Sequence, residues 1–488
     1  MPDNFVPTAA EMLRFLPELI LIVVGTLIMV LDPLTRHEDK NRLGILAILG
    51  LAGAAWGTFV AAQNGGPAFQ GMLLVDGFAT FFRYLVILVG ALTVMASLSY
   101  LKRENAEAGE YYALTVFSVV GQCVMVTANE LIMIFIGLEI SSIATYILAG
   151  YLRDDKRNNE SALKYFLLGS FATAFLLYGI AWIYGSTGTT NLAEIRRVLA
   201  SGEGAPSQAL LGLSAALMFV GFAFKVSAVP FQSWAPDVYQ GAPAPVSGFM
   251  SAGPKAAAFA IFLRVYLAAF EPIAAKWQAV VIVSAIATMI VGNFAALLQG
   301  NIKRMLAYSS IAHAGYVMVA IAAHNEIGTA AVMFYMASYA LMNVGAFAVI
   351  AHVARAGEKY VNTDDMAGLG VRQPVTAALL TIFLLSLIGV PLTGGFFGKF
   401  YIFKAALDAN LIWPTIIGLL NSAVAAYYYL RVIVVMYFRE PGESTADLPP
   451  LAPGVQAVLW GSALAILVLG IYPSVILDFA GRSANLVK

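Results

Sequence analysis

The chain has 488 residues, of which 60% are hydrophobic and only 11% are charged. Soluble globular domains carry about 25% charged residues, so this composition indicates a protein whose solvent is lipid. Lysine plus arginine balances aspartate plus glutamate at 28 each, which leaves no basic excess for binding nucleic acid. The single cysteine, Cys123, excludes an internal disulfide and a thiolate metal cage.

Apolar runs long enough to cross a bilayer recur along the whole chain. A transmembrane helix needs about 20 such residues. The first run follows Arg14 and has no small-residue cleavage site, which indicates a retained span. The scan predicts about 14 spans, at residues 15–33, 43–62, 78–100, 111–129, 131–152, 162–185, 208–230, 244–270, 278–299, 303–323, 328–354, 375–404, 411–438 and 455–479. The predicted fold class is therefore all-α: a polytopic membrane protein that forms a single membrane domain over residues 1–488.

The short loops predict the orientation of the spans. One set of alternate loops carries about twice as many lysines and arginines as the other set. Because cations concentrate on the cytoplasmic side, this bias places both termini outside the cytoplasm.

The span count also predicts an internal repeat. Three helices fall in residues 1–110, five in 111–270, five in 271–440 and the last in 441–488. An odd number of helices per block makes the second block enter the membrane from the opposite face, as in an inverted repeat. Pro230 and Pro391 lie in the fourth helix of their blocks, which predicts that the seventh and twelfth spans are broken. The stretch TGGFFGKF at 393–400 is interpreted as an unwound joint followed by a second half-helix.

Three titratable residues stand close to these breaks or in mid-span. Glu139 lies roughly 13 Å along its span, where a charge is too costly to face lipid. Lys225 precedes Pro230, and Lys399 follows Pro391. The ends of half-helices carry partial charges, so Lys225 is expected at a carbonyl end that favours the ammonium form. Lys399 is expected at an amide end that favours the neutral amine.

Three further residues complete a predicted row of titratable groups. Lys255 lies deep in its span beside Gly253, His313 follows Ser309 by one helical turn, and Lys164 lies near the cytoplasmic end of its span. A row of Glu139, Lys164, Lys225, Lys255, His313 and Lys399 has the chemistry of a proton relay.

The alternatives are structural. The lysines can snorkel or form fixed ion pairs, and His313 can be a packed polar residue. The arginines of the spans, Arg83, Arg264 and Arg431, are interpreted as anchors or structural pairs because arginine does not release its proton.

One long stretch resembles a known family. The segment KVSAVPFQSWAPDVYQGAPAPVSGFMSAGPKAAAFAIF at 225–262 resembles the antiporter-like membrane subunits of respiratory complex I and of the multi-subunit sodium/proton antiporters. GFFGKF at 395–400 and the lysine of GPKAAAFA look most like the subunit N branch of bacterial NADH-quinone oxidoreductase. The resemblance implies fourteen helices with two inverted five-helix repeats.

The resemblance also implies roles and partners. Glu139 and Lys225 would form a pair whose separation changes the proton affinity of the lysine, Lys255 would pass protons laterally, and Lys399 would face the outer exit. No cofactor is expected in this chain, since flavin, iron–sulfur clusters and quinone would be held by partner subunits. The expected partners are neighbouring antiporter-like membrane subunits in a bacterial inner membrane. A subunit of a cation/proton antiporter and a passive structural spacer remain the alternatives.

Overall fold

Long apolar helices dominate the structure, a computed structural model that describes residues 6–36, 40–202 and 207–486. Within these residues, 13 helices are long and apolar enough to cross a membrane. They are α2 (Leu16–Leu31), α3 (Asn41–Gln63), α4 (Gly77–Arg103), α5 (Gly109–Thr127), α6 (Leu131–Ala149), α7 (Lys156–Thr187), α9 (Gln208–Val226), α11 (Ala244–Leu263), α12 (Ala274–Leu297), α13 (Ile302–Ala322), α14 (Glu326–Val353), α18 (Ile412–Phe438) and α20 (Pro453–Ile471). The predicted helical membrane architecture is confirmed.

Two of the predicted spans are interrupted, as their prolines indicated. Helix α9 ends at Val226, and α10 (Trp234–Gly241) begins after a connection over residues 227–233, which we term the first joint. The predicted span 375–404 consists of α16 (Pro374–Ile388) and α17 (Gly394–Asp408), separated by a second joint over residues 389–393. Left-handed residues end the first half-helix in both cases, Ser227 with φ 63° and Gly389 with φ 93°.

Short elements fill the connections. They are α1 (Ala9–Arg14), α8 (Leu192–Ser201), α15 (Leu369–Arg372), α19 (Glu443–Ala446), α21 (Ser474–Ser483), the 3₁₀ turns η1 (Asp32–Leu34), η4 (Glu271–Ile273), η5 (Ala356–Glu358) and η6 (Thr363–Met366), and the π-helix η3 (Arg264–Ala269). Strands β1 (Gly66–Ala68) and β2 (Leu73–Val75) pair as an antiparallel hairpin, which the all-α prediction missed. The last predicted span, 455–479, was also too long, because α20 ends at Ile471 and Pro473 separates it from α21.

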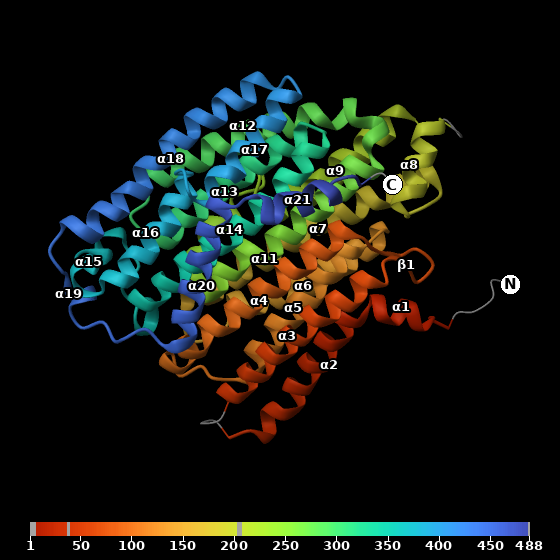
Figure 1. The fold of residues 1–488 in the computed structure, drawn as a ribbon. Coiled ribbons are helices and arrows are strands. Elements are labelled where there is room, and N and C mark those ends of the chain that lie inside the picture. The colour runs from red at the N-terminus through yellow and green to blue at the C-terminus, as the bar shows by residue number, and fades with distance from the viewer. Residues whose placement is uncertain (1–5, 37–39, 203–206, 487–488) are drawn as a thin grey trace.

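Three helices form the centre of the bundle. In α11 and α14 nearly every residue is buried, and α13 is almost as fully enclosed. Figure 1 shows them in the middle of the molecule, between α2 and α3 at one edge and α18 at the other. Lys255 lies on α11 and His313 on α13, so both predicted relay residues occupy the protein interior rather than a lipid-facing surface.

The two ends of the described chain lie at the same end of the bundle (Figure 1). Arg14 of α1 donates to the carbonyl oxygens of Asn64 and Pro67 near the hairpin, at 2.6 and 2.7 Å. The ring of Phe479 in α21 stacks on Phe81 near the start of α4, the helix that follows the hairpin. This arrangement agrees with an even number of membrane crossings.

Matching contacts occur in the two predicted five-helix blocks. An isolated β-bridge joins Glu130 to Asn191 in the first block, and another joins Asn301 to Asn362 in the second. Each bridge ties the residue before the second helix of its block to the connection that follows the third helix. These contacts are compatible with a repeat.

Candidate functional site

Lys225 lies in the last turn of α9, at the carbonyl end of a half-helix as predicted. Its side chain is buried, and Nζ donates to Ser142 Oγ at 2.8 Å and to Tyr165 Oη at 3.3 Å. Tyr165 stacks on Trp234 of α10, with the ring centroids 4.5 Å apart. Trp234 in turn donates from Nε1 to the carbonyl of Phe224, so aromatic side chains from α7 and α10 enclose the lysine.

Glu139 does not contact Lys225. No ion pair joins the two side chains in the part of the chain that the structure describes, and Glu139 Oε1 is buried without a hydrogen-bond partner. The reason is geometric: Ser142 is one helical turn further along α6, on the same face, and its hydroxyl takes the ammonium instead. The expected direct pair is therefore absent from this conformation.

Lys255 is held by the backbone and side chain of one serine. It is 2% exposed, and Nζ donates to Ser310 Oγ at 2.5 Å and to the Ser310 carbonyl at 3.1 Å. Ser310 lies on α13, so this contact links the two central helices. No acidic side chain pairs with Lys255 among the described residues.

His313 joins a cluster of hydroxyl groups in the interior. Its Nδ1 is hydrogen-bonded to Tyr335 Oη, and its Nε2 lies 3.2 Å from Tyr429 Oη. Tyr429 also bonds the hydroxyl of Ser309, which precedes Ser310 in the chain. The predicted polar face of Ser309 and His313 is therefore confirmed, and two tyrosines from α14 and α18 complete it.

Lys399 lies on α17 beside the second joint, but its expected environment was wrong. Its Nζ donates to the carbonyls of Leu387 and Ile388, at 3.0 and 2.8 Å, and to Ser422 Oγ at 2.8 Å. The long side chain reaches back across the joint to the carbonyl end of α16 rather than staying at the amide end of its own helix. Both joint lysines thus lie at carbonyl ends, which interact favourably with a cation.

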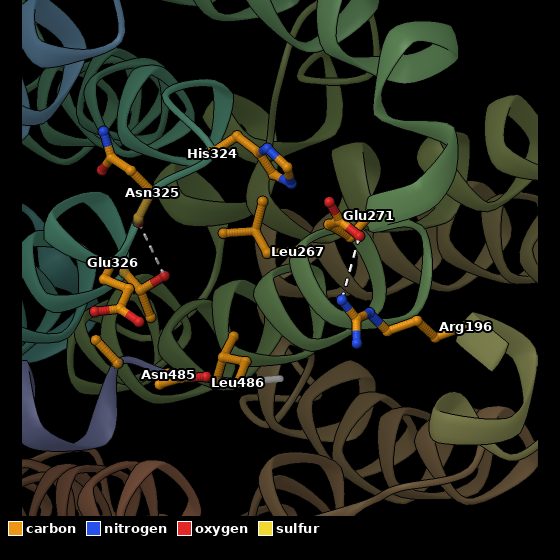
Figure 2. A pocket seen from close by; sticks show the side chains of 10 residues that line it. Arg196, Leu267, Glu271, His324, Asn325, Glu326, Asn485 and Leu486 are labelled. Atoms are coloured by element: carbon orange, nitrogen blue, oxygen red, sulfur yellow. Dashed lines mark hydrogen bonds and ion pairs between the residues drawn. The ribbon is translucent and has the colours of Figure 1, made fainter. Parts of the chain in front are cut away.

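Of two cavities, with volumes of about 380 Å³ and about 430 Å³, only the larger is lined by a predicted relay residue. The larger is lined by Lys399 and Ser422, together with apolar residues such as Phe400 and the exposed Lys404. The smaller, shown in Figure 2, lies between α8, the α13–α14 connection and the C-terminal segment, with Arg196 paired to Glu271 at one wall. None of the predicted relay residues lines the smaller cavity.

Lys164 lies apart from the central row. It is half-buried, and its Nζ is 2.7 Å from both Asp237 Oδ2 and Glu160 Oε1. Asp237 lies in α10 and also accepts from Arg304 Nη1 at 2.6 Å. This cluster ties α7, α10 and α13 together.

The arginines of the spans form structural contacts, as predicted. Arg83 pairs with Glu18, and both side chains are fully buried. Arg264 pairs with Asp76 at 2.7 Å, and Arg431 donates to the carbonyls of Leu297 and Gln299. Glu18 is thus a fully buried acid in the first turn of α2.

The structure thus brings Lys255, His313 and Lys399 together around α13. After Ser310 and His313, the next turn of this helix presents Tyr316, whose ring centroid lies 4.9 Å from Lys399 Nζ. Sequence reasoning missed the hydroxyl partners, namely Ser142, Ser310, Tyr335, Ser422 and Tyr429. The serine pairs in LEISS and YSSIAH were the available signals. Each pair lies within about one helical turn of a predicted relay residue, Glu139 in the first stretch and His313 in the second. No group of three or more potential metal ligands occurs within the described ranges.

Comparisons with known proteins identify the family. Residues 128–425 match the model for NADH:quinone oxidoreductase/Mrp antiporter transmembrane proteins. The NADH-quinone oxidoreductase subunit N 1 of Solibacter usitatus (strain Ellin6076) is 62% identical over 488 residues, covering 100% of both chains. The chain belongs to the subunit N branch of this NADH:quinone oxidoreductase/Mrp antiporter family.

Solved structures support the fold of the subunit N branch. A chain of respiratory complex I from Thermus thermophilus with bound aureothin is 33% identical, with a TM-score of 0.81 over 95% of this chain and 99% of that one. A chain of the Mrp complex from Dietzia sp. DQ12-45-1b is 19% identical, with a TM-score of 0.82 over 98% of this chain and 97% of that one. At that identity the second likeness shows the fold alone.

Proposed function

We propose that this chain moves protons across the membrane as one subunit of an NADH-quinone oxidoreductase. The observation that carries the proposal is the placement of three buried titratable residues, Lys255, His313 and Lys399, around one fully enclosed helix, α13. Charged groups inside a membrane protein are costly and are typically found on ion pathways. Subunit N relatives carry the name of the oxidoreductase, which supplies the driving reaction.

In this proposal the lysines hold protons and the hydroxyl groups pass them. Lys225 exchanges with Ser142 and Tyr165, and Lys255 exchanges with Ser310. Tyr429 carries protons between Ser309 and His313 because its hydroxyl both donates and accepts. Lys399 receives them beside the cavity of about 430 Å³ and releases them to the outer side.

The unpartnered Oε1 of Glu139 gives this residue a separate role. We propose that Glu139 changes the charge around Lys225 through motion of α6, since Ser142 rather than Glu139 accepts from the ammonium in the described conformation. A carboxylate that approaches the ammonium stabilises its proton, and one that withdraws promotes its release.

The assembly surrounding the chain follows from the same proposal. Flavin, iron–sulfur clusters and quinone are bound by other subunits, and this chain carries no cofactor of its own. The two predicted five-helix blocks act as inverted halves in a bacterial inner membrane, with both termini on the periplasmic side.

The test measures proton pumping and NADH oxidation in membrane vesicles that contain the whole complex. Lys225→Ala, Lys255→Ala and Lys399→Ala are each expected to lower both activities by roughly 100-fold, the lower end of the range for loss of a positioned proton-transfer group. Subunit content is checked by blue native electrophoresis. Lys359→Ala is the control, because Lys359 lies in an exposed loop region outside the spans. Normal pumping by all three assembled variants would show that the chain is a passive spacer.

The fold also suits a cation/proton antiporter, which the Mrp likeness keeps as the second candidate. The two functions differ in what drives proton movement. Proton uptake that depends on NADH supports the oxidoreductase, whereas uptake that depends on an imposed sodium gradient without NADH supports the antiporter.

A further inference from the structure

The first joint is held by a helix of the other predicted block. Helix α12 presents Ser284 and Thr288, spaced four residues apart and therefore on one helical face, to the backbone of Val229. The Val229 amide donates to Thr288 Oγ1 at 2.9 Å, and Ser284 Oγ donates to the Val229 carbonyl at 2.6 Å. Both polar groups of one residue in an unwound segment are thus satisfied by two side chains of a single helix.

A third hydrogen bond, within α12, orients the Thr288 hydroxyl. The Thr288 hydroxyl accepts from Val229 and donates to the carbonyl of Ser284, at 2.6 Å. The Ser284 hydroxyl then donates back to Val229. Each hydroxyl has one defined donor role, so replacing either one leaves a backbone group of Val229 without its partner. Val229 is half-buried, and an unpaired backbone group there is costly, so these bonds fix the native joint to α12.

The adjoining face of α12, which carries Gly292 one turn after Thr288, is packed tightly against α13. A Cβ atom on Gly292 would meet the backbone of Ala312, and one on Gly315 would meet the side chain and amide of Met289. Such close packing resists displacement of one helix relative to the other. Helix α13 also carries His313 and Ser310, and Ser310 accepts a hydrogen bond from Lys255.

The second joint is built differently. The Gly395 amide, just beyond it, donates to Ser386 Oγ at 3.1 Å, and Thr393 Oγ1 donates to the Val390 carbonyl at 2.7 Å. These partners come from the broken helix itself. The external clamp by two hydroxyls of another block is therefore a specific feature of the first joint, four residues after Lys225.

We infer that Ser284 and Thr288 are positioning residues that clamp the first joint to α12. The clamp thereby couples Lys225 to the three relay residues around α13, namely Lys255, His313 and Lys399. This inference rests on the proposed function, since it assumes that Lys225 takes part in proton transfer. Neither hydroxyl is a member of the proposed proton pathway. Their effect is to make movement of the joint and movement of the α12–α13 pair a single event.

The test uses Thr288→Val, which keeps the shape and removes the hydroxyl, and Ser284→Ala, in the whole complex in membrane vesicles. The number of protons pumped per NADH oxidised is expected to fall in both variants, because each removes a hydrogen bond that ties Val229 to α12. Thr288→Ser restores the hydroxyl and is expected to restore this ratio. A merely structural role would lower the amount of complex and leave the ratio unchanged.

Matched controls exist elsewhere in the bundle. Thr93 is buried and donates only within its own helix, to Val89 at 2.8 Å, and Ser462 Oγ is buried without a partner. Thr93→Val and Ser462→Ala should keep the normal proton-to-NADH ratio. If Thr288→Val prevents assembly, Ser284→Ala tests the inference instead, because this substitution removes only the hydroxyl oxygen.

Lys225→Ala, measured in parallel, separates the two ideas. Normal pumping by that variant shows that the proposed role of Lys225 is wrong, and the clamp inference falls with it. Lost pumping in Lys225→Ala together with a normal ratio in Thr288→Val and Ser284→Ala overturns the clamp alone.

Discussion

At the scale of single residues, the proposed relay depends on hydroxyl groups as well as on lysines. Lysine ammonium groups donate but cannot accept, so two lysines cannot pass a proton directly while both are charged. A hydroxyl between them both accepts and donates. The Tyr429 hydroxyl has this chemistry and links Ser309 to His313, since its oxygen bonds Ser309 and lies 3.2 Å from His313 Nε2.

Tyr429→Phe removes this hydroxyl while keeping the ring that fills the site. We expect proton pumping to fall roughly 100-fold, the lower end of the range for a positioned proton-transfer group. Pumping is measured by the quenching of a pH-sensitive dye in vesicles supplied with NADH. Tyr266→Phe is the matched control, because Tyr266 is equally buried but its hydroxyl donates only to the carbonyl of Ala215. Equal activity of the two variants would remove Tyr429 from the relay.

The residue scale also shows what could be predicted from sequence. Lys225, Lys255, His313 and Lys399 were found because a charge in an apolar run is conspicuous and costly. Their hydroxyl partners were not, because serine and tyrosine occur in membrane helices for many reasons. The absence of a Glu139–Lys225 ion pair was beyond reach as well, since it depends on which face of α6 meets α9.

Helix breaks are the feature that organises the elements. The prolines predicted both breaks, because proline removes a backbone hydrogen bond that only protein or water can replace. The reach of Lys399 back to the carbonyl end of α16 was not predicted, since a lysine side chain spans more than one helical turn. The clamp by Ser284 and Thr288 joins segments far apart in sequence, and no local pattern announces such a contact.

The Glu18–Arg83 pair joins α2 to α4 and gives a prediction on stability. Both side chains are fully buried, with Arg83 Nε and Nη2 each 3.0 Å from a carboxylate oxygen of Glu18. Glu18→Gln leaves a buried guanidinium without its counter-charge, which costs about 3–5 kcal/mol. We expect the Glu18→Gln chain to dissociate from the purified complex at a lower temperature than the native chain does.

The double variant Glu18→Gln with Arg83→Met provides the control. Removing both charges eliminates the uncompensated one, so the double variant should recover most of the lost stability. Retention of the chain is measured by electrophoresis after heating the detergent-solubilised complex. If the double variant is less stable than Glu18→Gln alone, the uncompensated charge of Arg83 is not the cause of the lost stability.

At the scale of the whole molecule, the even number of crossings fixes the relation between the two ends. The hairpin between α3 and α4 is contacted by α1, while α21 lies against the start of α4, so both described ends share one side. Which side that is follows from the distribution of cations over the loops, which predicts the periplasm. The outer release of protons beside Lys399 depends on this assignment.

Cysteine labelling tests the orientation directly. Cys123 is buried, so the native chain should not react with a membrane-impermeant maleimide. Val6→Cys and Gly481→Cys introduce thiols at exposed positions near the two ends, and Asn105→Cys introduces one on an exposed loop at the opposite end of α4. We expect the first two to be labelled in right-side-out spheroplasts and the third only in inverted vesicles. The reverse pattern would place the termini in the cytoplasm, and labelling of Val6→Cys and Gly481→Cys from different sides would contradict the even number of crossings.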